Sequence, residues 1–333
     1  MPGKRDTGRR PRPDPKLDNR GPAFSIRGLL VHVSFNMWRD RPFPRGEKGR
    51  NAWIAYSPRL RFSEKLYREA IGLMAEAGLN MVVLDLGDAV RWKSHPEIAL
   101  RDALPRRRFR ALLEWTRGQG VEPIPKLNFS AGHHRWLGQY RFMLCTPAYD
   151  RVVRDLIEEA AELFDGPRLF HLGMDEERFP TNDPEAYSLH NVTRHGRLWR
   201  DAVGHLGECT RRAGARPWVW GDPLWEGSDQ ERRRAFPKGF VVSDWHYHSA
   251  DDYPATRRIA EMGYELIPTT SNHSSAESTQ TYADWVRKNV PPRQVLGMLQ
   301  TVWRPLTASY RSRYVEAIDL AGRAFRAAPE KAK

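Results

Sequence analysis

The chain has 333 residues, of which 40% are hydrophobic and 11% aromatic, and its formal net charge is +13. This apolar content can offset the conformational entropy lost on folding, which excludes a wholly disordered chain. No run approaches the roughly 20 apolar residues that a membrane span needs, and two cysteines are too few for a disulfide framework. We expect a soluble protein. The sequence does not predict the oligomeric state. For the compartment, the cytoplasm is favoured, and export is the alternative if a signal peptide was removed.

Part of the positive charge lies in residues 1–22, a Pro-rich segment with seven Lys or Arg and three Asp. We predict that this segment is a disordered tail and that 23–333 form one catalytic domain. The remaining arginines are scattered over predicted helices, for example at 106–108 and 232–234, which favours solvated helix faces over a nucleic-acid groove. No nucleic-acid partner is expected.

After the tail, strand-like apolar runs alternate with amphipathic helical runs, the pattern of parallel βα units. Eight strands are predicted: 29–35, 80–86, 121–128, 168–174, 216–222, 240–245, 264–270 and 295–303. Eight units with nothing left over predict a (β/α)8 TIM barrel rather than an open doubly wound sheet.

The helices between these strands have recognisable ends. A helix over 64–77 is predicted behind a Ser63 cap, with Gly78 as its stop. Another opens with Thr146 as cap and Pro147 in the first turn. A last helix over 311–328 closes the outer ring.

In such barrels the functional side chains collect where strands end and βα loops begin. Carboxylates, tryptophans and other polar side chains gather at these positions, including Asp88 and Trp92 near the end of the second strand and Asn128 and His133 near the end of the third. An indole stacks on the apolar face of a pyranose, and carboxylates and amides bind its hydroxyls. The pattern therefore favours a carbohydrate substrate.

The fourth strand ends in the adjacent carboxylates Asp175 and Glu176. When two carboxyl groups share a confined site, the charge of one raises the pKa of the other. One can therefore remain protonated while its neighbour is ionised. Glu177, the third of the run, is expected to face solvent or a helix N-terminus, so Glu177→Gln should be mild.

These motifs resemble the catalytic barrel of glycoside hydrolase family 20, the β-N-acetylhexosaminidases. FHLGMDEE is similar to the family's strand-four motif His-x-Gly-Gly-Asp-Glu, and VEPIPKLNFSAGHH to its strand-three motif. RGLLVHVSFN, NMVVLDLGDAVRW, VWGD and VLGMLQTVW resemble its first, second, fifth and last strands.

The resemblance implies an exo-acting, substrate-assisted glycosidase that uses no cofactor. Glu176 would be the general acid/base and Asp175 would orient the substrate's 2-acetamido group, whose oxygen attacks the anomeric carbon. Tyr247 would hold the acetamido oxygen. The remaining substrate-binding candidates are His133, Asp88, Trp92, Asn128, Trp220, Asp222, Trp245 and Trp303.

Several of the family's polar positions are changed. His32 and Phe35 stand where the family has an Asp and a sugar-binding Arg, Lys126 and Asn128 replace an acidic pair, and Pro305 replaces an acidic residue. A site that loses such partners binds the original sugar less well. These changes favour another amino sugar or sugar derivative.

Two alternatives remain. A conventional retaining glycosidase would use Glu176 as acid and Asp222 or Asp244 as nucleophile, with the carboxyl groups about 5 to 5.5 Å apart. A non-catalytic carbohydrate-binding barrel would keep the sugar pocket without turnover. Metal catalysis is not expected, since His246 and His248 lack a clear third ligand.

Overall fold

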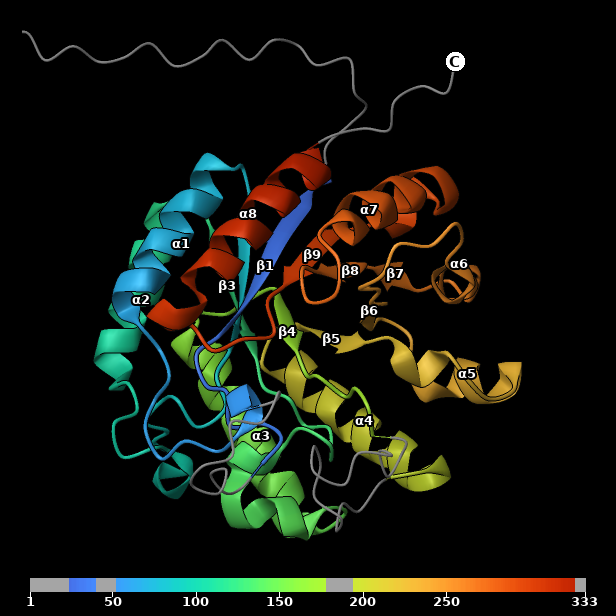
Figure 1. The fold of residues 1–333 in the computed structure, drawn as a ribbon. Coiled ribbons are helices and arrows are strands. Elements are labelled where there is room, and N and C mark those ends of the chain that lie inside the picture. The colour runs from blue at the N-terminus through green and yellow to red at the C-terminus, as the bar shows by residue number, and fades with distance from the viewer. Residues whose placement is uncertain (1–23, 40–51, 178–193, 327–333) are drawn as a thin grey trace, which may run out of the picture.

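The computed structural model describes residues 24–39, 52–177 and 194–326. Its strands are β1 (Ile26–His32), β2 (Met81–Asp85), β3 (Glu122–Lys126), β4 (Leu169–His171), β5 (Arg216–Trp220), β6 (Val241–Ser243), β7 (Glu265–Leu266), β8 (Thr269–Ser271) and β9 (Gly297–Thr301). Its helices are α1 (Glu64–Glu76), α2 (Arg106–Gly118), α3 (Pro147–Leu163), α4 (Gly196–Arg212), α5 (Asp229–Ala235), α6 (Pro254–Glu261), α7 (Glu277–Asn289) and α8 (Arg311–Arg326). The helices surround the strands (Figure 1).

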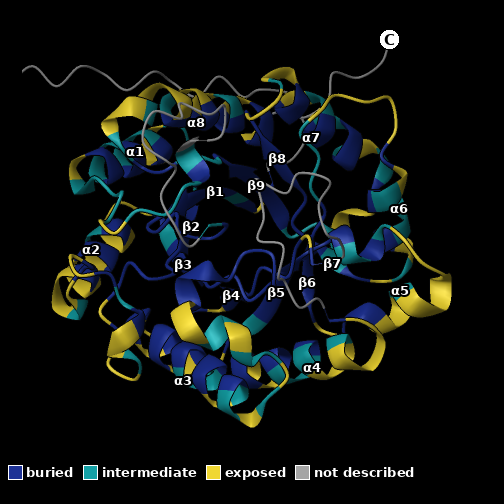
Figure 2. Ribbon diagram, turned by 60° about the horizontal axis from the view of Figure 1, so that its bottom comes forward, coloured by how far each residue is buried: buried dark blue, intermediate teal, exposed yellow. Residues whose placement is uncertain are grey.

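The strands are parallel and follow the order β7-β6-β5-β4-β3-β2-β1-β9-β8. The two ends of this order meet, since Trp245 bridges Thr269 and Leu266 bridges Val295. β7 and β8 are two halves of one strand interrupted near Pro268, which has no N–H to give to a ladder. The predicted eight-unit barrel is therefore confirmed, with its seventh strand broken in two, and Figure 2 shows the helical ring around the strands.

The barrel separates two apolar cores, because successive strand residues point to opposite faces. In β1, Leu29 and Val31 join the large cluster between the strands and the helices. Ile26 and Leu30 instead belong to the smaller cluster that includes Trp218. Because side chains alternate between the two faces of the strand, one continuous apolar run contributes to both apolar clusters.

The predicted caps are present. Ser63 accepts from the backbone N–H of Leu66 at the start of α1, and Thr146 does the same for Tyr149 at the start of α3. The first strand ends earlier than expected, at His32, because the N–H groups of Val33 and Ser34 both donate to the Asp85 carbonyl and leave the ladder.

Some predictions lie outside the described residues. The tail over 1–22 and the end of the last helix beyond 326 are among them, so the division at residue 23 stays a prediction. Among the described residues, no helix has the length and apolar character that crossing a membrane requires.

Candidate active site

The turn that follows β4 carries the two candidate catalytic carboxylates. Gly173 has φ +73°, and a Cβ at this position would lie 2.0 Å from Asn128 Oδ1, so only glycine fits. Met174 and Glu176 also have positive φ, 72° and 53°, a conformation that costs free energy in non-glycine residues. The turn is therefore held in shape by its surroundings.

Side chains from neighbouring strands hold this turn. The Asn128 amide donates to Asp175 Oδ1 at 2.8 Å, while its own oxygen accepts from the N–H groups of Ser130 and Met174. The Ser130 hydroxyl donates to the Asp175 carbonyl. On the other side, the N–H of Glu176 donates to Asp222 Oδ2 at 2.9 Å. Asn128 and Asp222 thus act on the carboxylate pair and do not line the pocket.

The prediction that Glu177 faces solvent is wrong. Its side chain and that of Arg194 are each 1% exposed, and they form an ion pair with Nε–Oε1 at 2.6 Å and Nη2–Oε2 at 2.7 Å. Glu177 Oε2 also accepts from the N–H of Ala131, and Arg194 Nη2 donates to the Phe129 carbonyl. The pair therefore ties the turn after β4 to the loop after β3.

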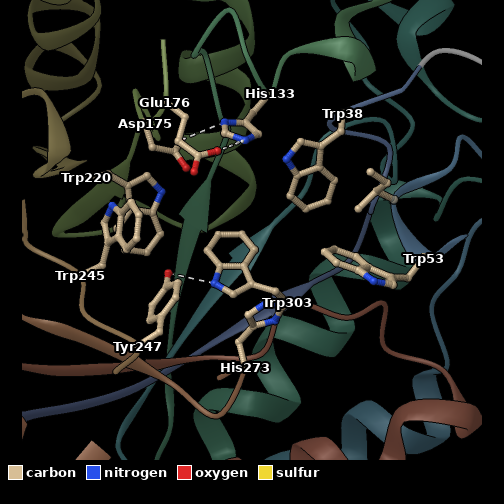
Figure 3. Close-up of a pocket in the computed structure, with 11 residues that line it drawn as sticks. Trp38, Trp53, His133, Asp175, Glu176, Trp220, Trp245, Tyr247, His273 and Trp303 are labelled. Carbon is tan, nitrogen blue, oxygen red and sulfur yellow. Dashed lines mark hydrogen bonds and ion pairs between the residues drawn. The ribbon is translucent and has the colours of Figure 1, made fainter. Parts of the chain in front are cut away.

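His133 lies between the two candidate catalytic carboxylates. Its Nδ1 is 3.3 Å from Asp175 Oδ1 and its Nε2 is 3.2 Å from Glu176 Oε2 (Figure 3). Burial lowers the pKa of His133, but the charges of Asp175 and Glu176 outweigh burial and raise it to about 10. Burial likewise opposes ionisation of Asp175, yet His133, Asn128 and Lys126 hold its pKa well below the ordinary value. At neutral pH the site holds an imidazolium beside an ionised Asp175.

Asp222 is a third buried carboxyl group next to this pair. Burial raises its pKa to about 7, and the charges of Asp175 and Glu176 act in the same direction. Its Oδ1 accepts from the Trp245 indole N–H at 3.3 Å. Asp222 therefore changes charge near neutrality while it contacts both the Glu176 backbone and a pocket wall.

Glu176 and Asp175 open into a cavity of about 310 Å³ that is walled mainly by aromatic rings. Its lining residues are Trp38, Trp53, Ile54, His133, Asp175, Glu176, Trp220, Trp245, Tyr247, His273 and Trp303 (Figure 3). The Glu176 side chain is 40% exposed, in contrast to its buried neighbours. The Trp303 indole N–H donates to Tyr247 Oη at 2.9 Å, which leaves the tyrosine O–H to donate elsewhere.

Sequence reasoning placed most of this wall but not all of it. Five of the predicted substrate-binding residues line the cavity together with the carboxylate pair. They are Trp220, Trp245, Tyr247, Trp303 and His133. Besides Asn128 and Asp222, two further candidates do not line it. Trp92 is buried in the outer core with its indole N–H on the Gly87 carbonyl, and Asp88 is buried and accepts from the Ser34 hydroxyl and the Asn36 amide.

Trp38, Trp53, Ile54 and His273 were not among the predicted site residues. Trp38 does follow the first strand, which is the signal that could have identified it. Trp53 lies in a short 3-10 helix (Ala52–Ile54) that comes after a long connection, and His273 follows the broken seventh strand. No strand pattern leads to Trp53, whereas His273 comes shortly after the predicted strand 264–270, which is the same kind of signal as that for Trp38.

A charged network lies inside the barrel beneath the pocket. The buried Lys126 ammonium donates to Asp85, and Asp85 Oδ2 lies 3.3 Å from His32 Nδ1. The His32 ring contacts Trp303, with ring centroids 5.2 Å apart. The replacements noted at His32 and Lys126 therefore form one internally paired set that contacts the Trp303 indole through His32.

The described residues contain no group of three or more His, Cys, Asp or Glu side chains arranged to hold a metal ion. The chemistry that these residues can perform is proton transfer and charge stabilisation at the pair Asp175 and Glu176.

No protein-family model matches the sequence, and no curated protein matches it. Solved structures do match. The exo-β-N-acetylglucosaminidase of family 20 from Vibrio harveyi has a TM-score of 0.66 at 14% identity, over 94% of this chain and 56% of that chain. The β-N-acetylhexosaminidases from Bacteroides fragilis (TM-score 0.64, 11% identity, 94% of this chain, 67% of that chain) and Streptomyces plicatus (0.62, 14%, 94%, 65%) are also similar.

The chain thus spans little more than half the length of the Vibrio harveyi enzyme. At these identities the likeness defines the fold, which is that of the family-20 barrel. The resemblance derived from the strand motifs is confirmed at that level.

Proposed function

We propose that this chain is a glycoside hydrolase that releases a terminal 2-acetamido sugar by substrate-assisted catalysis. The observation that carries the proposal is the adjacent pair Asp175 and Glu176, bridged by His133 at 3.3 and 3.2 Å and opening into an indole-walled cavity. Aromatic walls suit the apolar face of a pyranose, and a cavity of about 310 Å³ suits a ligand the size of one sugar unit.

In the first step the acetamido oxygen of the substrate attacks the anomeric carbon while Glu176 gives a proton to the departing glycosidic oxygen. The ionised Asp175 accepts the acetamido N–H and stabilises the positive charge that develops on that group. Tyr247, whose Oη already accepts from Trp303, donates its O–H to the acetamido oxygen. The products of this step are the freed alcohol and a bicyclic oxazolinium ion.

In the second step Glu176 takes a proton from water, whose oxygen attacks the anomeric carbon and reopens the ring. The proton that Glu176 takes from water restores the acid for the next cycle. His133, whose Nε2 lies 3.2 Å from Glu176 Oε2 and whose pKa is raised to about 10, keeps its own proton and orients the two carboxyl groups.

The geometry does not favour the conventional retaining alternative. Asp222 binds the Glu176 backbone and the Trp245 indole, and Asp244 is fully buried and bonded to Trp225 and His246. Neither carboxylate lines the cavity, so neither is presented to an anomeric carbon.

The experiment is turnover of a panel of nitrophenyl glycosides, followed by inhibition with a thiazoline that mimics the bicyclic intermediate. The proposal expects hydrolysis of a 2-acetamido glycoside and competitive inhibition by the thiazoline. Hydrolysis that the thiazoline leaves untouched would point to a separate nucleophile. Sugar binding without any turnover would point to a non-catalytic barrel.

A further inference from the structure

A second cavity lies on the outside of the barrel, where α4, α5 and α6 follow one another in the helical ring (Figure 2). Its volume is about 400 Å³, and it shares no lining residue with the active-site cavity. Phe236 and Tyr264 line it, and they precede β6 and β7, whereas the active site lies after the strands. This cavity is therefore separate from the proposed sugar pocket.

Four cationic side chains line this cavity, and none of the described residues that line it is Asp or Glu. They are Arg200 of α4, Arg233 and Arg234 of α5, and Lys238. All four are exposed and make no ion pair with the described residues. Cations that converge from separate elements repel one another, and an anion placed between them removes this cost. We call this site the basic cavity.

The structure divides the arginine run 232–234 between two roles. Arg232 is 14% exposed, and its Nη1 donates to Asp229 Oδ1 at 2.6 Å within α5. Arg233 and Arg234 have no such partner in the described chain and line the basic cavity instead. Two of the three charges are therefore available to a ligand.

Carboxylates mark the limit of the positive charge. An adjoining cavity between α4 and α5 shares Arg200 and Arg234 with the basic cavity, but Glu226 and Glu231 also line it. An anion gains less free energy there because carboxylates repel it. An anionic ligand therefore has its favourable position in the basic cavity.

Apolar side chains complete the lining of the basic cavity. They are Ala235, Phe236, Pro237, Met262 and Tyr264. The Tyr264 hydroxyl donates to the Phe236 carbonyl at 2.9 Å, which fixes the ring. Burial raises the pKa of Tyr264, and the charge of Arg233 acts in the opposite direction, so the guanidinium lies near the phenol. A ligand that fits this lining combines negative charge with apolar C–H surface.

We propose that the basic cavity binds an anionic glycan at a site apart from the active site. Sulfate and carboxylate oxygens accept charge-assisted hydrogen bonds from guanidinium and ammonium groups. The C–H face of the same sugar unit lies against Pro237 and Met262, which remain accessible at the surface. The choice of a glycan rests on the proposed function, whereas the binding itself needs no turnover.

A single-stranded nucleic acid is the competing polyanion. Proteins bind it by stacking successive bases on aromatic side chains. The aromatic residues of this lining, Phe236 and Tyr264, are only 2% and 9% exposed and do not offer such a platform. The lining therefore favours an anionic glycan over a nucleic acid.

The test measures calorimetric dissociation constants of the full chain for a sulfated dextran oligosaccharide, an oligouronate, neutral dextran and a single-stranded oligodeoxynucleotide of equal charge. We expect at least one anionic glycan to bind about tenfold or more tightly than neutral dextran and the oligonucleotide, with an affinity that falls as salt is added. The tighter of the two glycans identifies the oxyanion. Equal or tighter binding of the oligonucleotide, or no preference over neutral dextran, would overturn the proposal.

Matched double variants separate the basic cavity from the general positive charge of the chain. Arg233→Gln with Arg234→Gln should raise the dissociation constant of the anionic glycan by about tenfold or more. Arg107→Gln with Arg293→Gln removes the same charge from two exposed arginines that make no ion pair with the described residues, and it should leave the constant within about twofold of the parent. Equal weakening in the two double variants would reject the site.

A readout on the parent needs no substitution. Bound glycan should slow the acetylation of Lys238 and leave that of Lys288, which is exposed on α7, unchanged. Absence of protection at Lys238, or equal protection of both lysines, would contradict the site. Glycosidase turnover without this binding would reject only the basic cavity, and binding without turnover would reject only the proposed function.

Discussion

His133 Nε2 lies 3.2 Å from Glu176 Oε2, so the proposed proton donor faces a buried imidazolium. The pKa of His133 is raised from 6.5 to about 10 by Asp175 and Glu176, which outweigh burial. A raised histidine pKa stabilises the folded state fully below pH 6.5, and this contribution is lost as the pH rises toward about 10.

The contribution of His133 to stability should therefore depend on pH between 6.5 and about 10. The free energy of unfolding of the parent should exceed that of His133→Gln by most at pH 6, and the gap should narrow between pH 6.5 and 10. Urea unfolding of both proteins across this range measures the gap. A gap that stays constant with pH would show that His133 carries no bridging charge.

Asp222 predicts a second pH dependence of stability, at lower pH than that of His133. Its pKa is raised from 3.8 to about 7, first by burial and then by Asp175 and Glu176, so the folded state holds a proton that the unfolded chain releases. The stability of the parent relative to Asp222→Asn should therefore fall as the pH rises from 3.8 to about 7 and level off above. The same urea series measures it, and a relative stability that rises over this interval would contradict the assignment.

The buried pair of Glu177 and Arg194 predicts a large loss of stability when one partner is removed. Glu177→Gln leaves Arg194 charged and buried, a defect that costs about 3 to 5 kcal/mol. The matched control is Glu122→Gln, which removes the exposed partner of Arg168 and should cost less than about 1 kcal/mol. Denaturant unfolding compares the two, and equal losses would show that the buried pair does not anchor the turn after β4.

Gly173 predicts a loss of activity from a single added methyl group. A Cβ at Gly173 would lie 2.0 Å from Asn128 Oδ1, and φ there is +73°, so Gly173→Ala must displace the carboxylate pair. We expect a fall of about 10²-fold or more in kcat/KM, as for other misplacements of catalytic groups. Gly72→Ala is the control, since a Cβ there meets nothing within 4 Å in α1. Comparable activity in the two variants would contradict the role of the turn.

The sequence predicted the barrel because alternating strands and amphipathic helices follow local rules. The same rules do not reach into loops. Trp38 and Trp92 both follow strands, but Trp92 folds back onto the Gly87 carbonyl and enters the core, whereas Trp38 faces the cavity. Which way a loop turns depends on contacts between distant segments.

The carboxylate run shows the same limit. The motif located Asp175 and Glu176, yet it could not show that Glu177 is buried, because its partner Arg194 lies 17 residues further along the chain. The bridging role of His133 likewise depends on how the loops after β3 and β4 meet. Their position at the ends of predicted strands identified His133, Asp175 and Glu176. Which side chains pair with one another became evident only from the structure.

The central claim is that Glu176 protonates the leaving oxygen, and the most direct measurement is the dependence of kcat/KM on the acidity of the leaving group. For Glu176→Gln, the account predicts a loss of about 10²- to 10⁴-fold with poor leaving groups and a much smaller loss with a dinitrophenyl group, which needs no proton. The parent should show a shallow dependence. A uniform loss across all leaving groups, or activity that survives the substitution throughout, would contradict the account.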